Sequence, residues 1–250
     1  MKAVEVSGLR FRYPDGSEAL RGVSFAVEAG QCVGLIGPNG AGKSTLLWHL
    51  NGLLPDDLPE DGAVRIFGQP ITRHNVGEIR RQVGLVFQDP DDQLFCPTVY
   101  EDVAFGPEQM GLAAAEIAAR VKKALEQVGL SGFEKRSPHH LSGGEKRRVC
   151  LAGVLACDCS ILLLDEPTGG LDPRGRREFK ALLRDIPATR IIATHDLELV
   201  AEMCARVLVL DGGIIVADGP AAQVLSDEQL MLRHGLEKPH LLRHRHPHDG

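Results

Sequence analysis

A glycine-rich loop near the amino terminus constrains the fold of this 250-residue chain more than any other feature. The loop fits G-x-x-x-x-G-K-[ST], follows an apolar run that ends at Ile36, and opens a helical stretch. Its backbone N–H groups would form a nest for phosphate oxygens, and the helix N-terminus adds about half a positive charge there. A glycine-rich turn with a solvated lysine would not need this strand and helix context. We therefore expect a phosphate-binding loop in an α/β core, formed by Gly37, Pro38, Asn39, Gly40, Ala41, Gly42, Lys43, Ser44 and Thr45.

Two side chains of the loop and two later carboxylates have predicted chemical roles. Lys43 would reach the β- and γ-phosphates of a nucleotide, and the Ser44 hydroxyl would hold Mg²⁺. The apolar run 161–164 leads directly into Asp165 and Glu166. We expect Asp165 to complete the Mg²⁺ shell through water, and Glu166 to polarise the attacking water as general base. An exposed acidic turn at the end of a strand is the alternative interpretation of this pair.

The remaining pattern is that of a mixed α/β chain with an antiparallel part. Short, continuous apolar runs are typical of strands buried on both faces of a sheet. Near-alternation at the amino terminus and an Asp-Gly-Gly turn at 211–213 favour antiparallel pairing. We expect strands at 4–13, 23–27, 31–36, 62–67, 83–87, 160–164, 190–194, 207–210 and 214–217, and helices at 43–54 and 114–128.

The segment Leu141-Ser142-Gly143-Gly144-Glu145 narrows the class of phosphate-loop protein. Its serine and glycines lead into a helix, which would give a second N-terminus suited to anions. A surface helix that is merely capped is the alternative. With the other motifs in the same order, the sequence resembles the ABC ATPases along nearly its whole length. In that resemblance LSGGE is the signature motif, and the other matches are Gln88 in the Q-loop, Gly170-Leu171-Asp172 in the D-loop, the switch histidine His195, and Tyr13 as the adenine-stacking aromatic.

The resemblance implies a P-loop NTPase (ABC ATPase) core with a small antiparallel β subdomain and an inserted helical subdomain. The ATP-binding domain would span 1–236, with the insertion at about 89–158. ATP and Mg²⁺ would be required, with Gln88 as a further Mg²⁺ ligand. Glu166, His195 and Gln88 would serve hydrolysis. The signature residues would act on the nucleotide of an opposite subunit, so the chain would pair with itself or with a related ABC ATPase.

The stretch 86–95 resembles the Q-loop region of energy-coupling-factor transporter ATPases, notably the cobalt and nickel branch. The resemblance implies a peripheral subunit at the cytoplasmic face of the membrane that drives import through membrane-spanning partners. In that family, Asp91 and Asp92 would lie where the partner's coupling helices dock; a solvated acidic loop is the alternative. Another small solute, such as a vitamin, is the alternative cargo. The chain departs from the family at Gly169, where serine or alanine is more familiar.

Charge and length argue against other functional classes. The net charge of −6 does not suit a surface that neutralises a phosphate backbone, so we expect no nucleic-acid partner. An ABC ATPase acting on nucleic acid or ribosomes would typically carry two modules or a long coiled-coil insertion, and the sequence has neither. No signal peptide is evident, and the apolar runs fall well short of the ~20 residues that span a bilayer. Intact catalytic residues argue against a non-hydrolysing scaffold.

Two further groups of residues allow predictions about metal and redox state. The six cysteines show no paired C-x-x-C zinc spacing, and the C-x-C at Cys157 and Cys159 suggests packed, reduced thiols, which favours the cytosol. The segment 237–250 is predicted to be a His-rich tail that either binds Ni²⁺, Co²⁺ or Zn²⁺ or is simply a polar end. The histidines concerned are His234, His240, His244, His246 and His248.

Overall fold

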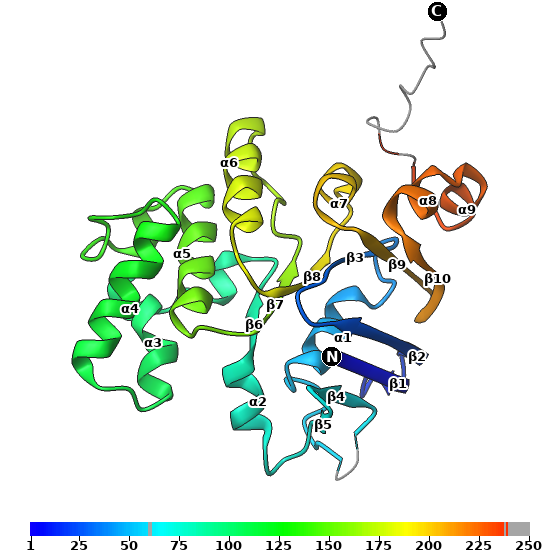
Figure 1. The fold of residues 1–250 in the computed structure, drawn as a ribbon, viewed down its shortest axis with the longest axis horizontal. Helices are drawn as coiled ribbons and strands as arrows, with labels where there is room; N and C mark the ends of the chain where they lie inside the picture. The colour runs from blue at the N-terminus through cyan, green and yellow to red at the C-terminus, as the bar shows by residue number, and fades with distance from the viewer. Residues whose placement is uncertain (60–61, 238, 240–250) are drawn as a thin grey trace, which may run out of the picture. The chain divides into compact units, whose positions relative to one another are not determined.

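The computed structural model describes residues 1–59, 62–237 and 239. The chain divides into two compact units, one formed by residues 1–73 together with the chain from Thr189 onward, the other by residues 74–188. The predicted helical insertion, at about 89–158, falls within the second unit, and the predicted domain limits stay predictions. The predicted tail lies outside the described residues, apart from residues 237 and 239. Figure 1 labels the elements of both units.

A parallel set of strands forms the core of the first unit. Strand β3 (Cys32–Ile36) lies between β8 (Thr189–Ala193) and β9 (Arg206–Asp211), and it is parallel to both. Strand β10 (Ile214–Pro220) returns antiparallel to β9 through the predicted glycine turn. Helix α7 (Leu197–Met203) packs on β3, and α8 (Ala221–Ser226) and α9 (Glu228–Arg233) follow β10. The apolar runs of the sequence thus become buried strands, as predicted.

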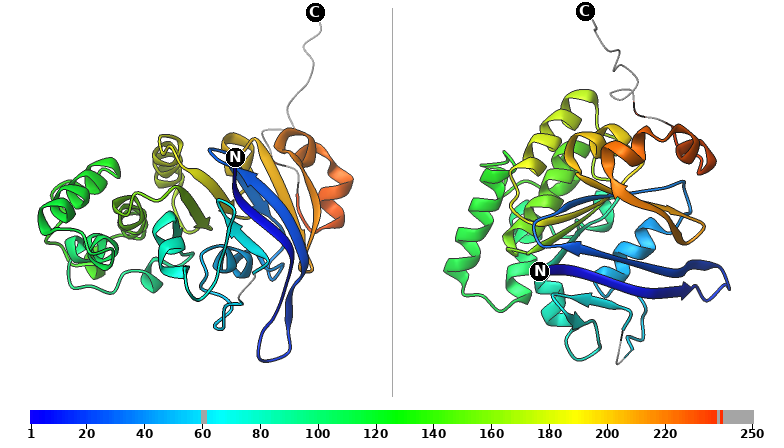
Figure 2. Two further views of the ribbon diagram at one scale, coloured as in Figure 1. Left: turned by 60° about the horizontal axis from the view of Figure 1, so that its bottom comes forward. Right: turned by 45° about the vertical axis from the view of Figure 1, so that its right-hand side comes forward.

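The second sheet of this unit is antiparallel, as the alternating pattern at the amino terminus predicts. Strand β1 (Lys2–Arg12) lies between β2 (Glu18–Glu28) and β4 (Val64–Ile66), and β5 (Gln69–Pro70) completes the sheet. The β1–β2 pair is the long blue ribbon pair of Figure 2. Strand β2 begins five residues before the predicted start at 23, because its register with β1 continues to the Arg12–Glu18 pair.

Helix α1 (Lys43–Leu50) is shorter than the predicted helix at 43–54. The chain turns at Gly52, whose φ is +71°. The Leu53 N–H bonds to the Trp48 carbonyl at 2.8 Å and the Gly52 N–H to the His49 carbonyl at 3.2 Å, which is the Schellman pattern of a helix C-terminus. Leu53, which the periodicity assigned to the apolar face, is therefore exposed.

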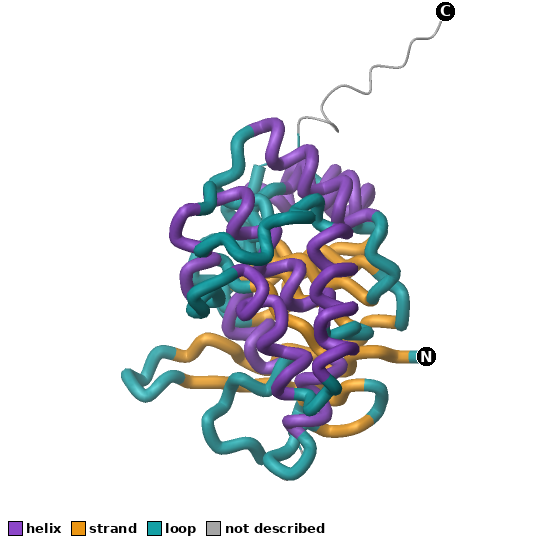
Figure 3. The backbone as a smooth tube through the Cα atoms, turned by 90° about the vertical axis from the view of Figure 1, so that its left-hand side faces the viewer, coloured by secondary structure: helices purple, strands orange, loops and turns teal. Residues whose placement is uncertain are grey.

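The second unit is mainly helical. Helices α3, α4 and α5 pack on one another, and Figure 3 draws the helices of the chain in purple. The short strands β6 and β7 pair in parallel. Its elements are α2 (Val76–Gln82), β6 (Val83–Val86), η1 (Pro90–Asp92), α3 (Val99–Gln109), α4 (Ala114–Gln127), η2 (Pro138–His140), α5 (Gly143–Ala156), β7 (Ile161–Asp165) and α6 (Pro173–Arg184).

Helix α4 confirms the predicted helix at 114–128 to within a residue. Its buried side chains recur at helical spacing, at Ile117, Val121, Ala124 and Leu125, and its opposite face is charged. Within the described ranges, no helix combines the length and the apolar character that crossing a membrane requires.

Candidate functional site

The glycine-rich loop connects β3 to α1 in the first unit, in the strand–loop–helix context that the motif requires. A Cβ on Gly37 would lie 2.0 Å from the Leu210 carbonyl oxygen, and one on Gly42 would lie 2.6 Å from that of Ala19. Gly42 also has a φ of +102°, which an L side chain rarely adopts. Both positions therefore require glycine, because the backbone of the loop passes close to the backbone at Leu210 and Ala19.

The Lys43 side chain is buried and hydrogen-bonded to the backbone of the loop. Lys43 is 8% exposed, and its Nζ donates to the Gly37 carbonyl at 2.8 Å and to the Pro38 carbonyl at 3.0 Å. The positive charge therefore lies beside the backbone that the motif uses as a phosphate nest. Ser44, the predicted Mg²⁺ ligand, is the next residue of α1.

Tyr13 lies beside the first turn of α1. Its hydroxyl is 2.9 Å from the Thr45 Oγ1, and its ring meets that of Phe11 edge to face with centroids 4.9 Å apart. Phe11 also contacts the His49 ring, whose Nδ1 is 2.8 Å from the Thr45 carbonyl oxygen. Burial lowers the pKa of His49, so the imidazole is neutral near pH 7. The structure thus places Tyr13 next to the phosphate loop, and its adenine-stacking role stays a prediction.

His195 lies at the same sheet edge as the loop. Strands β3 and β8 are parallel with Leu35 opposite Ala193, so Gly37 and His195, each two residues further on, leave the carboxyl ends of neighbouring strands. The Thr194 N–H donates to the Leu35 carbonyl at 3.1 Å, which extends the pairing toward His195. The register therefore brings His195 toward the start of the phosphate loop, with its side chain exposed.

In the second unit, the register of two parallel strands brings Gln88 and Glu166 to the same sheet edge. Strands β6 and β7 are parallel with Val86 opposite Leu164, so Gln88 and Glu166 each follow two residues later at one sheet edge. Asp165 and Glu166 are 3% and 7% exposed. Glu166 has a φ of +45°, uncommon for a residue with a side chain and typical of functional positions. A buried strand therefore delivers two carboxylates at a sharp change of backbone direction.

Arg147, in the basic run after LSGGE, joins these motifs. Its guanidinium donates to three carbonyl oxygens, those of Glu166 at 2.9 Å, Gly169 at 2.8 Å and Gln88 at 3.2 Å. The side chain is 7% exposed, and burial lowers the pKa of the guanidinium from its ordinary value. One side chain of α5 thus fixes the backbone of the Q-loop, of the residue predicted to be the base, and of the chain entering the D-loop.

The signature motif forms the amino terminus of α5. Ser142 is the N-cap, and its Oγ accepts from the Glu145 N–H at 3.3 Å, while a Glu145 carboxylate oxygen accepts from the Ser142 N–H at 2.8 Å. The hydrogen bond from the Ser142 hydroxyl, at 2.7 Å, lowers the pKa of Glu145. This capping box leaves the exposed Ser142 and Gly143 at the helix end. Asp172 caps α6 in turn, accepting from the Gly175 N–H at 2.6 Å.

The acidic segment after Gln88 is tied to α5. The Gln93 side chain accepts from the Phe87 N–H at 3.2 Å and donates to the Cys150 carbonyl at 3.0 Å. Asp91 forms an ion pair with Lys146 at 2.6 Å, so its carboxylate already has a cation in its own chain. The predicted docking role of Asp91 and Asp92 stays a prediction, and Asp91 would enter such an interface already paired with Lys146. Asp92 is exposed.

The signature and the Q-loop were predicted from the sequence, but Arg147 and Gln93 were missed as the residues that connect the two segments. The basic run Lys146–Arg148 was a signal for Arg147, because a charged residue one turn into a buried helix needs internal acceptors. No comparable signal exists for Gln93, whose role depends on the fold of the loop.

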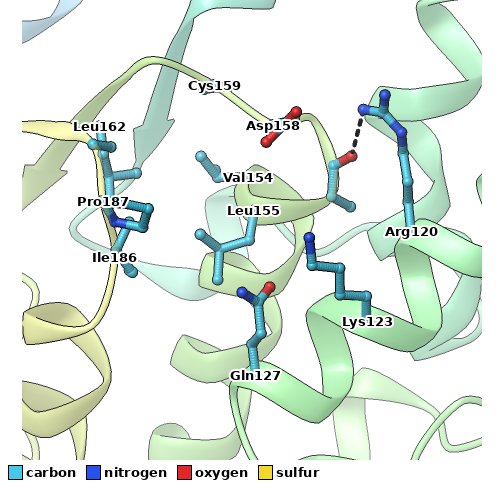
Figure 4. Close-up of a pocket in the computed structure, with 12 residues that line it drawn as sticks. Arg120, Lys123, Gln127, Val154, Leu155, Asp158, Cys159, Leu162, Ile186 and Pro187 are labelled. Carbon is cyan, nitrogen blue, oxygen red and sulfur yellow. Dashed lines mark hydrogen bonds between the residues drawn. The ribbon is translucent and has the colours of Figure 1, made fainter.

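A cavity of about 360 Å³ elsewhere in the second unit contains none of the predicted site residues. Figure 4 shows it between α4, the end of α5 and the chain at 186–188, with the hydrogen bond from Arg120 to the Ala156 carbonyl. Its wall combines Arg120 and Lys123 with apolar side chains such as Leu162. We assign it no part in the chemistry.

The predicted metal-binding tail lies almost wholly outside the described residues and stays a prediction. His234 ends α9, and its Nδ1 lies 2.7 Å from an Asp211 carboxylate oxygen. The other four histidines lie outside the described residues. Among the residues that are described, no group of three or more His, Cys, Asp or Glu side chains could hold a metal ion.

A phosphate loop between a buried strand and a helix, followed along the chain by a buried strand that ends in two carboxylates, defines a P-loop nucleoside triphosphatase. The ABC transporter family model matches residues 20–169. The chain belongs to this family, as an ATP-binding subunit with ATPase activity.

Three relatives support this assignment. The energy-coupling factor transporter ATP-binding protein EcfA of Methanocaldococcus jannaschii is 49% identical over 244 residues, which cover 96% of this chain and 86% of EcfA. The structure of cbiO1 from Clostridium perfringens, part of the ABC transporter complex cbiONQ, has a TM-score of 0.80 at 38% identity, covering 93% of this chain and 94% of its own. The ATP-binding cassette MJ0796, in a dimer bound to ADP and Pi, has a TM-score of 0.76 at 28% identity, covering 87% and 98%.

Proposed function

We propose that the chain is the ATP-hydrolysing subunit of an energy-coupling-factor importer, and that it powers the uptake of cobalt or nickel ions. The observation that carries the coupling part of this proposal is the set of three hydrogen bonds made by Arg147. A displacement of the Q-loop by a membrane partner would reach the backbone of Glu166 through a single rigid side chain. Hydrolysis would thereby depend on the state of the partner.

Nucleotide binding is assigned to the first unit. The loop N–H groups and the N-terminus of α1 would hold the phosphate oxygens, and Lys43 would turn from the loop carbonyls to the β- and γ-phosphates. Tyr13, fixed by Phe11 and Thr45, would offer its ring face to adenine, since aromatic faces accept purines readily.

Hydrolysis is assigned to Glu166, with His195 and Gln88 in support. The Glu166 carboxylate would take a proton from water as its oxygen attacks the γ-phosphate, while His195 would contact that phosphate. Ser44, Gln88 and Asp165 provide hydroxyl, amide and carboxylate oxygens, a donor set that suits Mg²⁺. When bound, Mg²⁺ would neutralise charge on the phosphates. The buried position of Asp165 at the end of β7 fits a carboxylate held in place for this purpose.

The exposed signature helix end supports pairing of two copies, or of this chain with a related ATPase. Ser142 and Gly143 lie at a capped helix N-terminus and would face the γ-phosphate held by the opposite subunit. The dimer of MJ0796 with ADP and Pi is consistent with this arrangement. ATP itself would then hold the two subunits together until hydrolysis releases them.

The surface beside the Q-loop supports a membrane-spanning partner, which would place the chain at the cytoplasmic face of the membrane. Phe95 and Phe105 pack edge to face with centroids 4.9 Å apart, yet remain 64% and 41% exposed. Exposed aromatic pairs of this kind suit a protein interface. Asp92, three residues before Phe95 in the chain, adds an exposed acidic group for a basic partner residue.

The identity of the transported substrate is the most specific part of the proposal. The resemblance of residues 86–95 to the cobalt and nickel branch supports it, and the likeness to EcfA and cbiO1 supports the energy-coupling-factor type. Another ion or a vitamin is the alternative, because substrate choice would be made by the membrane-spanning subunits.

The test combines purification with uptake. The tagged chain, expressed with its genomic neighbours, is expected to co-purify with membrane-spanning proteins from solubilised membranes. Cells carrying the wild-type chain should accumulate radioactive Co²⁺ or Ni²⁺, and cells carrying Glu166→Gln should not, although the variant still co-purifies. Recovery with ribosomes instead of membrane proteins would contradict the transport assignment, and uptake of a vitamin but not of either metal would contradict the cargo.

A further inference from the structure

Two thiols lie side by side in the first unit. The Sγ atoms of Cys32 and Cys204 are 3.6 Å apart, although the two residues are separated by 172 positions in the sequence. Cys32 begins β3 and is half-buried, while Cys204 ends α7 and is 5% exposed. Both are free thiols.

The elements that carry these thiols are packed closely. A Cβ on Gly34 of β3 would lie 2.6 Å from a methyl group of Val200 on α7, so the helix rests directly on the strand backbone (Figure 1). Val200 lies one turn before Cys204, whose N–H bonds to the Val200 carbonyl at 2.9 Å. The tight contact keeps the backbones of α7 and β3 close together. Forming an S–S bond of ~2.05 Å requires them to approach by about 1.5 Å, a distance that side-chain rotation can supply.

We propose that Cys32 and Cys204 are a redox-active dithiol. Hydroperoxides such as hydrogen peroxide would oxidise it to a reversible intramolecular disulfide between the two residues. The bond would join the two chain segments that build the first unit, residues 1–73 and the chain from Thr189 onward, across the whole inserted second unit. It would therefore act as a covalent staple on the unit that carries the phosphate loop.

The two thiols have different roles in this reaction. The hydrogen bond from the Cys204 thiol lowers the pKa of Cys32, and the same contact together with burial raises that of Cys204. The Cys32 thiolate would attack one peroxide oxygen and break the O–O bond, becoming a sulfenic acid, and the hydroxide that leaves would take a proton from solvent to give the first water. The Cys204 thiol would then attack the Cys32 sulfur, form the S–S bond and give its proton to the departing hydroxide, which leaves as the second water. The dithiol loses two electrons, and hydrogen peroxide is reduced to two waters.

The other cysteines provide internal comparisons. Burial raises the pKa of Cys96 to about 11 and that of Cys150 to about 12, so both thiols stay protonated and react slowly. Cys157 and Cys159 also interact, and a hydrogen bond between their thiols lowers the pKa of Cys157. A Cys157→Ser/Cys159→Ser double variant removes this second pair and leaves the proposed dithiol intact.

The experiment treats the full-length chain with hydrogen peroxide, blocks remaining thiols with a maleimide, and maps tryptic peptides by mass spectrometry. We expect a cross-linked peptide pair containing Cys32 and Cys204, at equal yield in wild type and in the Cys157→Ser/Cys159→Ser variant, and its loss after dithiothreitol. The oxidised protein should also show a Tm several degrees higher than the reduced protein, an increase that Cys32→Ser abolishes. That variant also controls for oxidation of methionine.

Two results would overturn the proposal. One is peroxide treatment that carries Cys32 to the sulfinic acid while Cys204 remains open to the maleimide. The other is a cross-linked species that disappears in the Cys157→Ser/Cys159→Ser variant, because the reactive pair would then be the C-x-C. Neither readout depends on a substituted Cys32, so a folding defect in that variant would not affect the conclusion.

Discussion

Arg147 shows how much of this site depends on one buried side chain. A guanidinium offers five donors in a fixed geometry, and here it satisfies backbone acceptors from three separate motifs. Because Arg147 donates to backbone carbonyls of both segments, it positions the Gln88 and Glu166 segments relative to each other. Arg147 is in this sense a positioning residue, not a catalytic one.

The first prediction concerns this arginine. Arg147→Met keeps the side-chain volume but leaves three carbonyl acceptors without their donor, and each buried unsatisfied group costs about 1–3 kcal/mol. We expect ATP hydrolysis to fall at least ~10-fold, with ATP affinity changed less than ~3-fold because the phosphate loop lies in the other unit. Steady-state hydrolysis and nucleotide titration measure the two quantities.

Arg148→Met is the matched control. Arg148 pairs with Glu178 at a partly exposed position, and such pairs contribute about 0–1 kcal/mol. Near-normal hydrolysis is expected for this variant. Equal loss of activity in both variants would show that the three carbonyl contacts are not what matters.

Two helices of the second unit, α3 and α5, both begin with a capping box. Ser142 and Glu145 form the capping box of α5, and Thr98 and Glu101 form that of α3. The cap explains the stability of either helix equally well. Only the α5 cap lies in a motif that we assign to nucleotide binding, so the pair separates a structural role from a functional one.

The second prediction uses this pair of caps. Ser142→Ala and Thr98→Ala should each lower the free energy of unfolding by about 1 kcal/mol, measured by urea denaturation, because each removes one N-cap hydrogen bond. Only Ser142→Ala should reduce hydrolysis, by an expected ~10-fold or more. If the two variants lose activity to the same extent, the loss reflects helix stability, and the functional role of the signature serine is wrong.

Elements whose apolar pattern comes from burial were predicted well from the sequence. The end of a helix, which is set by backbone hydrogen bonds, was predicted less accurately. The continuous runs at 160–164 and 190–194 became β7 and β8, because a strand buried on both faces must be apolar throughout. The end of α1 was placed too late, since the leucines at 53 and 54 extended the pattern while Gly52 ended the helix. Motif spacing predicted the phosphate loop and Glu166, and the structure places the loop between β3 and α1 and Glu166 after β7. The contacts of Arg147 depend on three separate loops, and no local pattern encodes them.

At the scale of the whole molecule, the chain order matters as much as the fold of each unit. The phosphate loop and His195 lie in a unit built from both ends of the chain, and the signature, Gln88 and Glu166 lie in the inserted unit. Each unit contributes part of the proposed chemistry. The second unit also carries Phe95 and Phe105, so the surface proposed for the membrane partner belongs to the same unit as Gln88 and Glu166.

The third prediction tests that surface. Phe95→Ser removes an aromatic group that is 64% exposed, and loss of an aromatic residue at an interface hot spot costs about 2 kcal/mol or more in binding. Co-purification with membrane-spanning subunits should fall at least ~10-fold, while hydrolysis by the isolated chain stays within ~2-fold. Leu232→Ser is the control, since Leu232 is 62% exposed on α9 in the other unit. A variant at Phe95 that co-purifies as well as the control would exclude this surface as the docking site.

We propose that ATP joins the Lys43 loop of one copy to the Ser142 helix end of another, and light scattering on a Glu166→Gln chain measures this association. With ATP and Mg²⁺, this slowly hydrolysing variant should change from 27.1 kDa to twice that mass. Adding Ser142→Asp keeps an N-cap as good as serine but places a negative charge against the γ-phosphate. We predict that this double variant binds ATP and stays monomeric. A double variant that still dimerises with ATP would contradict the account.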